Sequence, residues 1–463
     1  MQPIDNTNIQ LAPIKLVIPG RYYDCQIYRG KLYLWTMDGS VQVYNWNKLI
    51  NSIVMPKFTF RLPFVYGYLE GNFLYDKKVA CVFGEKDYQS VLLKQYQHLA
   101  NKSVDLSLDE LASAKLQELD MPMNELPIDT EVYANNVYFA VDSGVYRRVL
   151  HNNSLDHSIG SMDIQLWDCR VLSLRANKYP QIALSAGSEG LFELNLVKDD
   201  VIKPKALECV DETTIYRISN KPSSFSNYSF LSVFSSSYLD DSFMALFNWK
   251  PLSLLSLQTL GSKDFKVYRD FDGVIDEKKI FRDTDESDIC WGIEDKIYRI
   301  KDDKLSILKF NNAANLQKGE DYYMPLQNVN LPSNIGRPIS AGASYFGIVL
   351  EFTNGIMVLR SDSNVTTIPE EVIRWRVYPR SKNYLNHLHL LYDDRLEIYS
   401  FNHDSLVNQA TKRIGIEYIP DEEPVFKSRN AGRGRPSNYF NANLPLQSGD
   451  FNEFNLNEVD LPF

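Results

Sequence analysis

The feature that most constrains the fold is a recurring pair of short apolar segments joined by a tight polar turn, found seven times. Gly, Asp or Asn occupies each turn, and these residues tolerate the positive φ values of two-residue hairpin turns. The flanking segments are rich in β-branched and aromatic residues, and aromatics make up 13% of the chain, which favours strands. The predicted hairpins are 32–46, 137–150, 182–196, 230–249, 288–300, 345–360 and 388–401.

The spacing of the hairpins distinguishes between two all-β architectures. Their turn positions are Gly39, Gly144, Gly190, Asp241, Asp295, Gly355 and Asp394, which lie 105, 46, 51, 54, 60 and 39 residues apart. All separations but the first are near the roughly 40–50 residues of a four-stranded propeller blade. A pair of β-sandwiches, the alternative, should show turns every 8–12 residues or so without a longer period. The sequence therefore predicts an all-β fold, a seven-bladed β-propeller over residues 1–420, with six or eight blades as alternatives.

The long first separation contains a segment, residues 85–126, whose apolar residues follow a helical period. The first predicted helix has an apolar face made of Val91, Leu92, Tyr96 and Leu99. Ser107 and Glu110 have the spacing of a capping box, which predicts the start of a second helix that Pro122 ends. Its apolar stripe is predicted to comprise Leu108, Leu111, Ala112, Leu116 and Leu119. Such a helical hairpin, inserted in the propeller, either packs against a blade or protrudes as a docking element for a partner.

The final segment, residues 421–463, loses all periodicity and is rich in Asn, Pro, Ser, Gly, Phe and acidic residues. This composition predicts an extended or flexible tail. Its end, residues 451–463, combines acidic residues with spaced apolar ones, as in linear motifs that fold onto a partner. The candidate protein-binding residues are Phe451, Phe454, Leu456, Leu461 and Phe463. The alternative is a tail that packs back on its own propeller.

A short basic segment of this tail resembles the core of an AT-hook, whose Pro-Arg-Gly-Arg-Pro sequence lies in the minor groove of A·T-rich DNA. The matching residues are Arg433, Gly434, Arg435 and Pro436, and Gly432 stands where the first proline would be. The resemblance implies that both arginines enter the groove and that the glycine allows close approach. A formal net charge of −10 provides little basic surface for binding to phosphates, so direct contact with nucleic acid is not favoured.

Two histidines, His387 and His389, alternate along a predicted strand and so share one of its faces. Paired histidines at this spacing could bind a metal if a third ligand joined them. Because no recognisable ligand spacing follows them, the pattern favours a polar face on a strand of a blade.

A basic run interleaved with aromatic residues can also be interpreted from the alternation along a strand. Alternation places Arg374 and Arg376 on one face of a strand and Trp375 on the other. Together with Arg380 and Lys382 they could bind nucleic acid through phosphate contacts and stacking. A solvated strand edge is the favoured interpretation, because charged residues commonly protect edges.

The cellular setting is predicted from three observations. The five cysteines are dispersed without a C-x-x-C pair, which favours free thiols in a reducing compartment. The N-terminal residues lack the basic and apolar regions of a secretory signal. The most apolar window, residues 339–359, contains Glu351 and the turn pair Asn354-Gly355, so it predicts a hairpin and not a membrane span. We expect a cytoplasmic protein with no membrane association.

Trp167 and Asp168 resemble the Trp-Asp strand ending of a WD40 repeat, in a chain whose hairpin spacing is similar to that of a divergent WD40-like β-propeller. The pair occurs once, so the resemblance is one of pattern over about residues 15–410. Proteins of that superfamily usually act as interaction platforms. The resemblance therefore implies a protein-binding role.

Sequence signatures of enzymes are absent. Residues 187–190 depart from the G-x-S-x-G nucleophile motif, and the chain has no P-loop and no H-E-x-x-H zinc helix. We therefore predict no catalytic residue, cofactor or metal. The hypothesis is a non-catalytic scaffold or regulatory subunit of a larger complex, with protein partners on a propeller face, the helical insertion or the tail. The alternatives are an enzyme or small-ligand binder that uses the propeller channel, and a DNA-associated regulator that uses the AT-hook-like segment.

Overall fold

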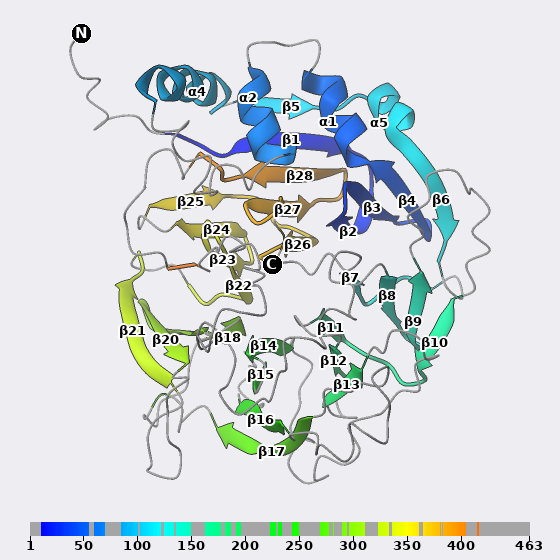
Figure 1. The fold of residues 1–463 in the computed structure, drawn as a ribbon, viewed down its shortest axis with the longest axis vertical. Helices are drawn as coiled ribbons and strands as arrows, with labels where there is room; N and C mark the ends of the chain where they lie inside the picture. Colours follow the sequence, from blue (N-terminus) through cyan, green and yellow to red (C-terminus); the bar gives the residue numbers. More distant parts are fainter. Residues whose placement is uncertain are drawn as a thin grey trace, which may run out of the picture. The chain divides into compact units, whose positions relative to one another are not determined.

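The fold was obtained as a computed structural model (Figure 1). The residues that the structure describes are 11–54, 60–69, 85–100, 102–121, 125–133, 136–149, 163–176, 181–186, 191–195, 223–227, 230–233, 243–249, 269–276, 281, 289–293, 296–310, 323–332, 336–360, 364–379, 381, 383–403 and 414–415. They belong to two compact units. The described part of unit 1 lies within Met1–Leu126 and Gly342–Pro420, and that of unit 2 within Pro127–Ala341.

The described strands of both units form seven small sheets, here named A to G. All seven predicted hairpins are confirmed, because the two strands of each pair in antiparallel fashion. Each hairpin belongs to a different sheet. One hairpin per sheet, repeated along the chain, is the organisation of blades in propeller-type folds. The mainly β architecture of small, mostly four-stranded sheets is therefore shown, whereas the closed propeller and the number of its blades stay predictions.

Unit 2 contains sheets C, D, E and F, with strand orders β10-β9-β8-β7, β11-β12-β13, β14-β15-β16-β17 and β18-β19-β20-β21. Its strands are β7 (Asp129–Tyr133), β8 (Asn136–Val141), β9 (Gly144–Val149), β10 (Ile164–Trp167), β11 (Ser173–Ala176), β12 (Gln181–Ser185), β13 (Leu191–Asn195), β14 (Ser223–Asn227), β15 (Phe230–Val233), β16 (Phe243–Trp249), β17 (Arg269–Asp276), β18 (Ile289–Ile293), β19 (Lys296–Lys301), β20 (Lys304–Phe310) and β21 (Tyr323–Asn330). Gly144, at the turn of the β8–β9 hairpin, has a φ of 137°, which only glycine adopts readily.

Unit 1 contains sheets A, B and G, with strand orders β26-β27-β28-β1-β5, β2-β3-β4-β6 and β22-β23-β24-β25, and only the first two residues of β22 fall in unit 2. Its strands are β1 (Ile14–Pro19), β2 (Tyr22–Tyr28), β3 (Lys31–Thr36), β4 (Ser40–Asn45), β5 (Ser103–Asp105), β6 (Lys115–Asp120), β22 (Ser340–Ser344), β23 (Gly347–Phe352), β24 (Gly355–Arg360), β25 (Val365–Ile368), β26 (Arg374–Val377), β27 (His387–Leu391) and β28 (Arg395–Ser400).

Sheet A joins the two ends of the described chain. Strand β1 pairs in antiparallel fashion with β28, and Ile14 lies opposite Ser400. Ile14, Leu16 and Ile18 are fully buried, as the period of two in a half-buried strand requires. On its other side β1 pairs in parallel with the short strand β5. The N-terminal strand therefore completes a sheet whose other long strands come from residues 374–400.

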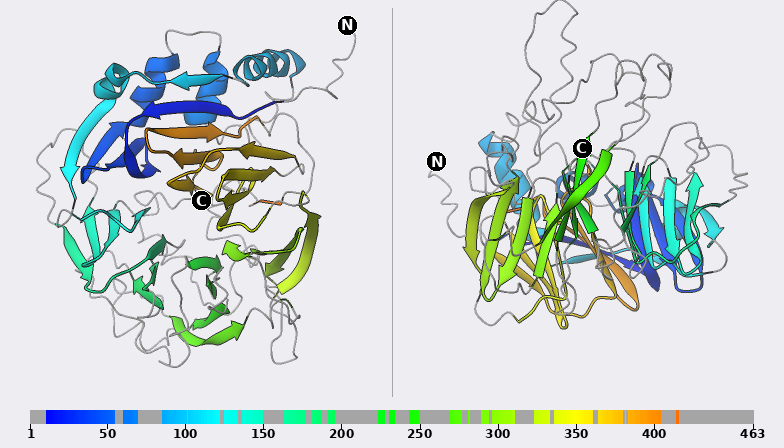
Figure 2. Two further views of the ribbon diagram at one scale, coloured as in Figure 1. Left: turned by 180° about the vertical axis from the view of Figure 1, so that it is seen from behind. Right: turned by 90° about the horizontal axis from the view of Figure 1, so that it is seen from below.

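Helices lie on the side of sheet A that contains β1 and β5. They are α1 (Trp46–Val54), α2 (Arg61–Phe64), the π-helix η3 (Val65–Leu69), α4 (Lys86–Leu99) and α5 (Leu108–Ala114). Figures 1 and 2 show α1, α2 and α4 beside β1 and β5, away from β26. None of the helices in the described ranges is long and apolar enough to cross a membrane.

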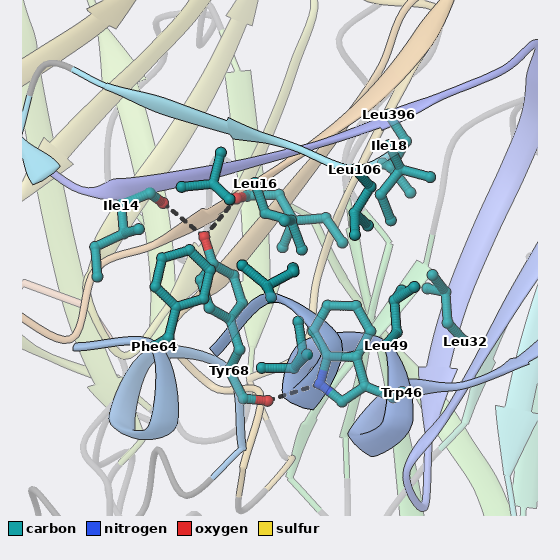
Figure 3. Packing of buried hydrophobic residues seen from close by; sticks show 14 of the residues in the cluster. Ile14, Leu16, Ile18, Leu32, Trp46, Leu49, Phe64, Tyr68, Leu106 and Leu396 are labelled. Carbon is teal, nitrogen blue, oxygen red and sulfur yellow. Dashed lines mark hydrogen bonds between the residues drawn. The ribbon is translucent and has the colours of Figure 1, made fainter. Parts of the chain in front are cut away.

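The helices are fixed to sheet A by a shared apolar core with two hydrogen-bonded anchors. Trp46, Phe64 and Tyr68 are buried against the side chains of β1 (Figure 3). The indole Nε1–H of Trp46 donates to the carbonyl oxygen of Tyr68 at 2.6 Å. The hydroxyl of Tyr68 lies 2.9 and 3.0 Å from the carbonyl oxygens of Ile14 and Ile398. A buried tyrosine or tryptophan usually satisfies its polar group in this way.

The two predicted helices of residues 85–126 are present with corrections. In α4, Leu92, Tyr96 and Leu99 are buried as predicted, but Val91 is 48% exposed, so its assignment to the apolar face is wrong. Helix α5 begins with the predicted capping box: Ser107 Oγ accepts the backbone N–H of Glu110, and the Glu110 carboxylate accepts the backbone N–H of Ser107.

The second helix is shorter than predicted. It ends at Ala114, and Leu116 and Leu119 lie on strand β6, so their assignment to the helix is wrong. Strand β6 pairs with β4 and completes sheet B. The edge of β4 offers backbone hydrogen bonds that outweigh the favourable helix propensity of these residues, as tertiary context often does. The segment therefore contributes strands to two sheets, β5 to sheet A and β6 to sheet B.

Candidate functional site

Two polar arrangements in unit 1 are the candidates for function, one buried and one at the surface. The buried one centres on Asp24 of β2, whose side chain is fully enclosed. Arg376 donates to both of its oxygens, at 2.9 Å from Nε and 2.6 Å from Nη2. Arg374 Nη1 adds a bond at 2.9 Å, and the backbone N–H of Cys25 another at 2.8 Å. A buried carboxylate with this many charge-assisted donors is fully compensated.

The interpretation of the basic run as a solvated edge is wrong for its first two members. Strand β26 does lie at the edge of sheet A, but Arg374 and Arg376 cover Asp24 of sheet B instead of facing water. Only 10% of the Arg376 side chain is exposed. Arg380 and Lys382, the remaining members, lie outside the described residues.

The predicted alternation along β26 is confirmed by its opposite face. Trp375 packs with Val377 against the core of sheet G, and its Nε1–H donates to Glu351 Oε2 at 3.0 Å. A Cβ on Gly342 of β22 would lie 2.7 Å from the Trp375 ring. Strand β26 is therefore held on one face by ion pairs to sheet B and on the other by aromatic packing against sheet G.

Unit 2 contains the same arrangement of a buried Asp bonded to an Arg. Asp129 of β7 is buried, and its carboxylate accepts the backbone N–H of Thr130, just as Asp24 accepts that of Cys25. Its other oxygen accepts Arg175 Nη1 and the backbone N–H of Leu174 from sheet D, both at 2.9 Å. A buried Asp on one sheet bonded to an Arg on the next thus occurs in both units, which indicates a structural role.

His387 and His389 share one face of β27, as predicted, and that polar face is buried. His387 Nε2 lies 2.7 Å from the carbonyl oxygen of Gly67 in η3, so this nitrogen must carry a proton. Burial lowers the pKa of His387 to about 4, so the ring is neutral and its Nδ1 accepts. His389 Nε2, 3.5 Å from that Nδ1, must therefore be the donor.

This assignment fixes the rest of the chain of contacts. His389 Nδ1 is an acceptor, and it faces the Cys25 thiol at 3.5 Å and the Tyr378 hydroxyl at 3.4 Å. Burial raises the pKa of the Cys25 thiol above its ordinary value, so the thiol keeps its proton and donates it. The contacts run in one direction, from Cys25 through both histidines to the carbonyl of Gly67.

The direction of these contacts favours a hydrogen-bonded histidine pair over a metal site. The ring nitrogens are engaged with one another and with protein groups instead of converging on a common point. Among the described residues, no group of three His, Cys, Asp or Glu is placed to hold a metal ion. A protonated buried thiol is also a poor nucleophile, because the thiolate is the reactive form. The described cysteines, Cys25, Cys169 and Cys290, form no disulfide.

The surface arrangement is an open groove of about 580 Å³ on unit 1. Segments distant in sequence form it: the β1–β2 connection, the end of β3 with the following turn, β4, and helix α5 with its C-terminal neighbour. The lining residues are Pro19, Gly20, Arg21, Tyr22, Thr36, Met37, Asp38, Gln42, Tyr44, Leu108, Leu111, Ala112 and Lys115.

One wall of the groove is apolar. Leu111 of α5 is buried and anchors the helix to the core, whereas Leu108, one turn earlier, is 71% exposed. Met37, in the β3–β4 turn, is 42% exposed. Large apolar side chains that remain in water at the rim of a concave surface are typical of contact sites.

Three polar lining residues, Gln42, Tyr44 and Lys115, belong to a hydrogen-bonded group beside the groove. Glu118 of β6 accepts hydrogen bonds from Lys115 Nζ at 2.7 Å, Ser40 Oγ at 2.9 Å and Gln42 Nε2 at 3.2 Å. These bonds lower the pKa of Glu118 to about 2, and the bond from Lys115 has the largest effect. Tyr44 donates to Gln42 Oε1 at 2.7 Å. Each of the three lining residues is held by a neighbour, so these side chains need no rearrangement to receive a ligand.

The tail candidates of the sequence lie outside the described residues and stay predictions: Arg433, Gly434, Arg435, Pro436, Phe451, Phe454, Leu456, Leu461 and Phe463. Of the Trp-Asp pair, Trp167 ends β10 and packs partly buried against the core of unit 2. Sequence reasoning missed Asp24 and most of the groove. A lone acid in the apolar strand YYDCQIY was the available signal for Asp24. No local signal brings α5 to the β3–β4 turn.

Comparisons with known proteins find matches only among solved structures. No family model matches the chain, and no curated protein matches it. Solved structures of β-propeller-type proteins do match it. A COPII outer coat vertex on membranes covers 64% of this chain and 74% of its own, at 10% identity and a TM-score of 0.38. BBS1N in complex with ARL6DN covers 85% of this chain and 96% of its own, at 9% identity and a TM-score of 0.38. Hsv2 of Kluyveromyces lactis covers 62% and 77%, at 11% identity and a TM-score of 0.36. Similarity at this level assigns neither a family nor a function.

Proposed function

We propose that this chain is a non-catalytic protein-interaction scaffold that works in a larger complex, and that the groove of unit 1 is one of its docking surfaces. The observation that carries the proposal is the exposure of Leu108 and Met37 at the rim of a preformed groove. Binding sites are commonly built on connections that a rigid sheet framework holds in place. The β1–β2 connection, the β3–β4 turn and α5 are such elements.

The buried cluster supports the scaffold over an enzyme within unit 1. Its ionisable groups, Asp24, Cys25 and the two histidines, are enclosed and bonded to one another, so none is presented to a substrate. The predicted docking role of residues 85–126 is also compatible with the structure. One face of α5 packs inward through Leu111 and Ala114, while Leu108 points to solvent. Further docking by residues 451–463 and a cytoplasmic location belong to the same proposal.

Purification of the untagged chain under native conditions, with quantification of the proteins that accompany it, tests the proposal. We expect Leu108→Asp to lose a partner that the unmodified chain retains, since a buried aliphatic anchor often contributes about 2 kcal/mol to an interface. Val91→Asp is the matched control, because Val91 is also exposed and helical but does not line the groove. Retention of every partner by both Leu108→Asp and Met37→Asp would contradict the proposal.

The ligand-binding alternative has its own test. The purified chain is heated with divalent metals or common metabolites, and its Tm is measured. A compound that binds only the folded state raises Tm in proportion to its saturation. A saturable rise with one compound, which persists in Leu108→Asp, would favour a small-ligand site over the proposed scaffold.

A further inference from the structure

The π-helix η3 is attached to its surroundings through three consecutive carbonyl groups near its C-terminal end. Asn402, just after β28, donates to Tyr66 O, and His387 Nε2 on β27 donates to Gly67 O at 2.7 Å. The third carbonyl accepts the indole N–H of Trp46 in α1 at 2.6 Å. The last carbonyls of a helix lack partners within it, so neighbouring side chains commonly satisfy them. Polar contacts as well as apolar packing therefore join η3 to α1 and to sheet A.

Of these three donors, only His387 is of a type that titrates between pH 4 and pH 7. Its ring centroid lies 5.4 Å from that of Tyr68 in η3 and 6.1 Å from that of Trp46 in α1. Tyr384 packs on it at 5.4 Å, and His389 is its neighbour on β27 at 5.6 Å. None of these facing groups carries a negative charge below pH 7, so a proton on His387 gains no counter-charge from them.

The hydrogen bond on the other side of the ring also opposes protonation. Neutral His387 accepts from His389 Nε2 at 3.5 Å, and a proton on its Nδ1 would set two N–H groups against each other. His389 relieves this conflict only by moving its own proton to Nδ1, which ends its acceptance from the Cys25 thiol. Burial, the largest cause, lowers the pKa of His387 to about 4, although the bond to Gly67 raises it. The enclosed ring therefore takes up a proton only at a cost, which water would remove.

The elements that cover His387 are short. Helix α1 has nine residues and η3 has five. Isolated helices shorter than about 12–15 residues are marginal in water, so these two depend on their packing against sheet A. The hairpins of sheets A and G are instead held by backbone pairing between their own strands. Because proteins open in parts whose free energies differ, the two helices should open at a lower cost than the sheets.

We infer that His387 is an acid-sensitive latch, whose protonation releases α1 and η3 from sheet A while the hairpins stay paired. Mild acid would then expose the face of sheet A that the two helices cover. The inference goes beyond the docking role proposed for the groove and does not depend on it. It differs from general acid unfolding because the opening is confined to the two helices.

Hydrogen–deuterium exchange of the full-length chain, read by mass spectrometry, tests the inference. Exchange is measured at pH 7 and at pH 4.5, and the labelling times are corrected for the intrinsic rate at each pH. The opening equilibrium constant of residues 46–54 and 61–69 should rise about fiftyfold at pH 4.5, since the ring titrates near pH 6.5 when exposed and at about 4 when enclosed. That of residues 347–360, the β23–β24 hairpin of the same unit, should change by less than about threefold.

Two variants assign the acid response to one residue. His387→Gln keeps a donor for Gly67 O but does not titrate, so its helices should exchange alike at both pH values. His98→Gln is the matched control, because His98 is an exposed histidine of α4, and it should keep the full acid response. Equal loss of protection in the helices and in residues 347–360, no loss at pH 4.5, or an undiminished response in His387→Gln would overturn the inference. The first two of these outcomes need only the unmodified chain, so the test does not depend on how well the variant folds.

Discussion

The Asp24 cluster and the groove lie in the same unit, and both combine carboxylates, arginines or lysines and large side chains, but they differ in what remains unpaired. Around Asp24, each oxygen of the carboxylate accepts hydrogen bonds, and the tautomer of each histidine is fixed by its hydrogen-bond partner. Around the groove, Leu108 and Met37 stay in water, and Asp38 has no cationic partner among the described residues. The comparison indicates that the clustered polar residues of a sequence can serve stability, while a surface with fewer polar contacts remains available for binding.

The largest test of this contrast is Asp24→Asn. The substitution leaves Arg374 and Arg376 beside a neutral amide in an enclosed site, and removing one partner of a buried ion pair costs about 3–5 kcal/mol. Urea unfolding should show the midpoint shifted sharply downward. The matched surface change, Asp38→Asn, should alter the free energy of unfolding by less than about 0.5 kcal/mol. Similar losses in both variants would erase the distinction between the two regions.

A second test uses pH. Burial lowers the pKa of His387 to about 4. The pKa of His389 is well below its ordinary value, mainly because of burial and to a smaller extent because of His387. Both rings are therefore neutral when folded but take up protons near pH 6.5 when unfolded. Stability should be complete above about pH 6.5 and should fall as the pH drops toward 4, by roughly 3 kcal/mol for His387.

The groups that face the two rings restrict how this loss can be relieved. Tyr68 and Tyr384 pack on His387, while Cys25 and Tyr378 face His389, and the pKa values of Tyr68, Cys25 and Tyr378 are raised by burial. These three groups stay neutral at pH 4–7 and offer no counter-charge. Urea unfolding measured from pH 7.5 to 4.5 should show a flatter profile for His389→Gln than for the unmodified chain. An unchanged slope would mean that other groups cause the acid sensitivity.

The third test concerns the packing that holds β26 from its other face. In Gly342→Ala the new methyl group would lie 2.7 Å from the Trp375 ring, and overpacking of this kind costs about 1–3 kcal/mol. The free energy of unfolding should fall accordingly. In a double-mutant cycle, Trp375→Leu makes room for the methyl group, so the second substitution should cost less in that background. Additive losses would place the strain elsewhere.

The extent to which the sequence predicted the structure follows the range of the interactions. The hairpins depend on neighbouring residues, so alternation and turn chemistry were enough to predict all seven, from residues 32–46 to 388–401. The capping box at Ser107 is equally local and is confirmed. The end of α5 is not local: it depends on pairing with β4, which lies some 75 residues earlier in the chain.

The sites depend on still longer separations. His387 meets Gly67 across 320 positions, and Arg376 meets Asp24 across 352. The sequence gives each residue its chemistry and its face on a strand, but it does not specify which sheet lies opposite. For that reason the alternation of Arg374, Trp375 and Arg376 was predicted correctly while their surroundings were not. The groove, assembled from separate segments, has no counterpart in any local pattern.

An equally small change in stability is expected from Leu108→Ser, and this variant separates folding from binding most clearly. Because Leu108 is 71% exposed, its loss should change the free energy of unfolding by less than about 0.5 kcal/mol. Its neighbour Leu111 is buried in the core, so Leu111→Ser should cost about 2–4 kcal/mol by comparison. Partner retention should respond differently, because Leu108→Ser stays folded but loses the exposed apolar contact at the groove. If Leu108→Ser unfolds as readily as Leu111→Ser, then Leu108 belongs to the core, and the groove loses its apolar wall as a docking surface.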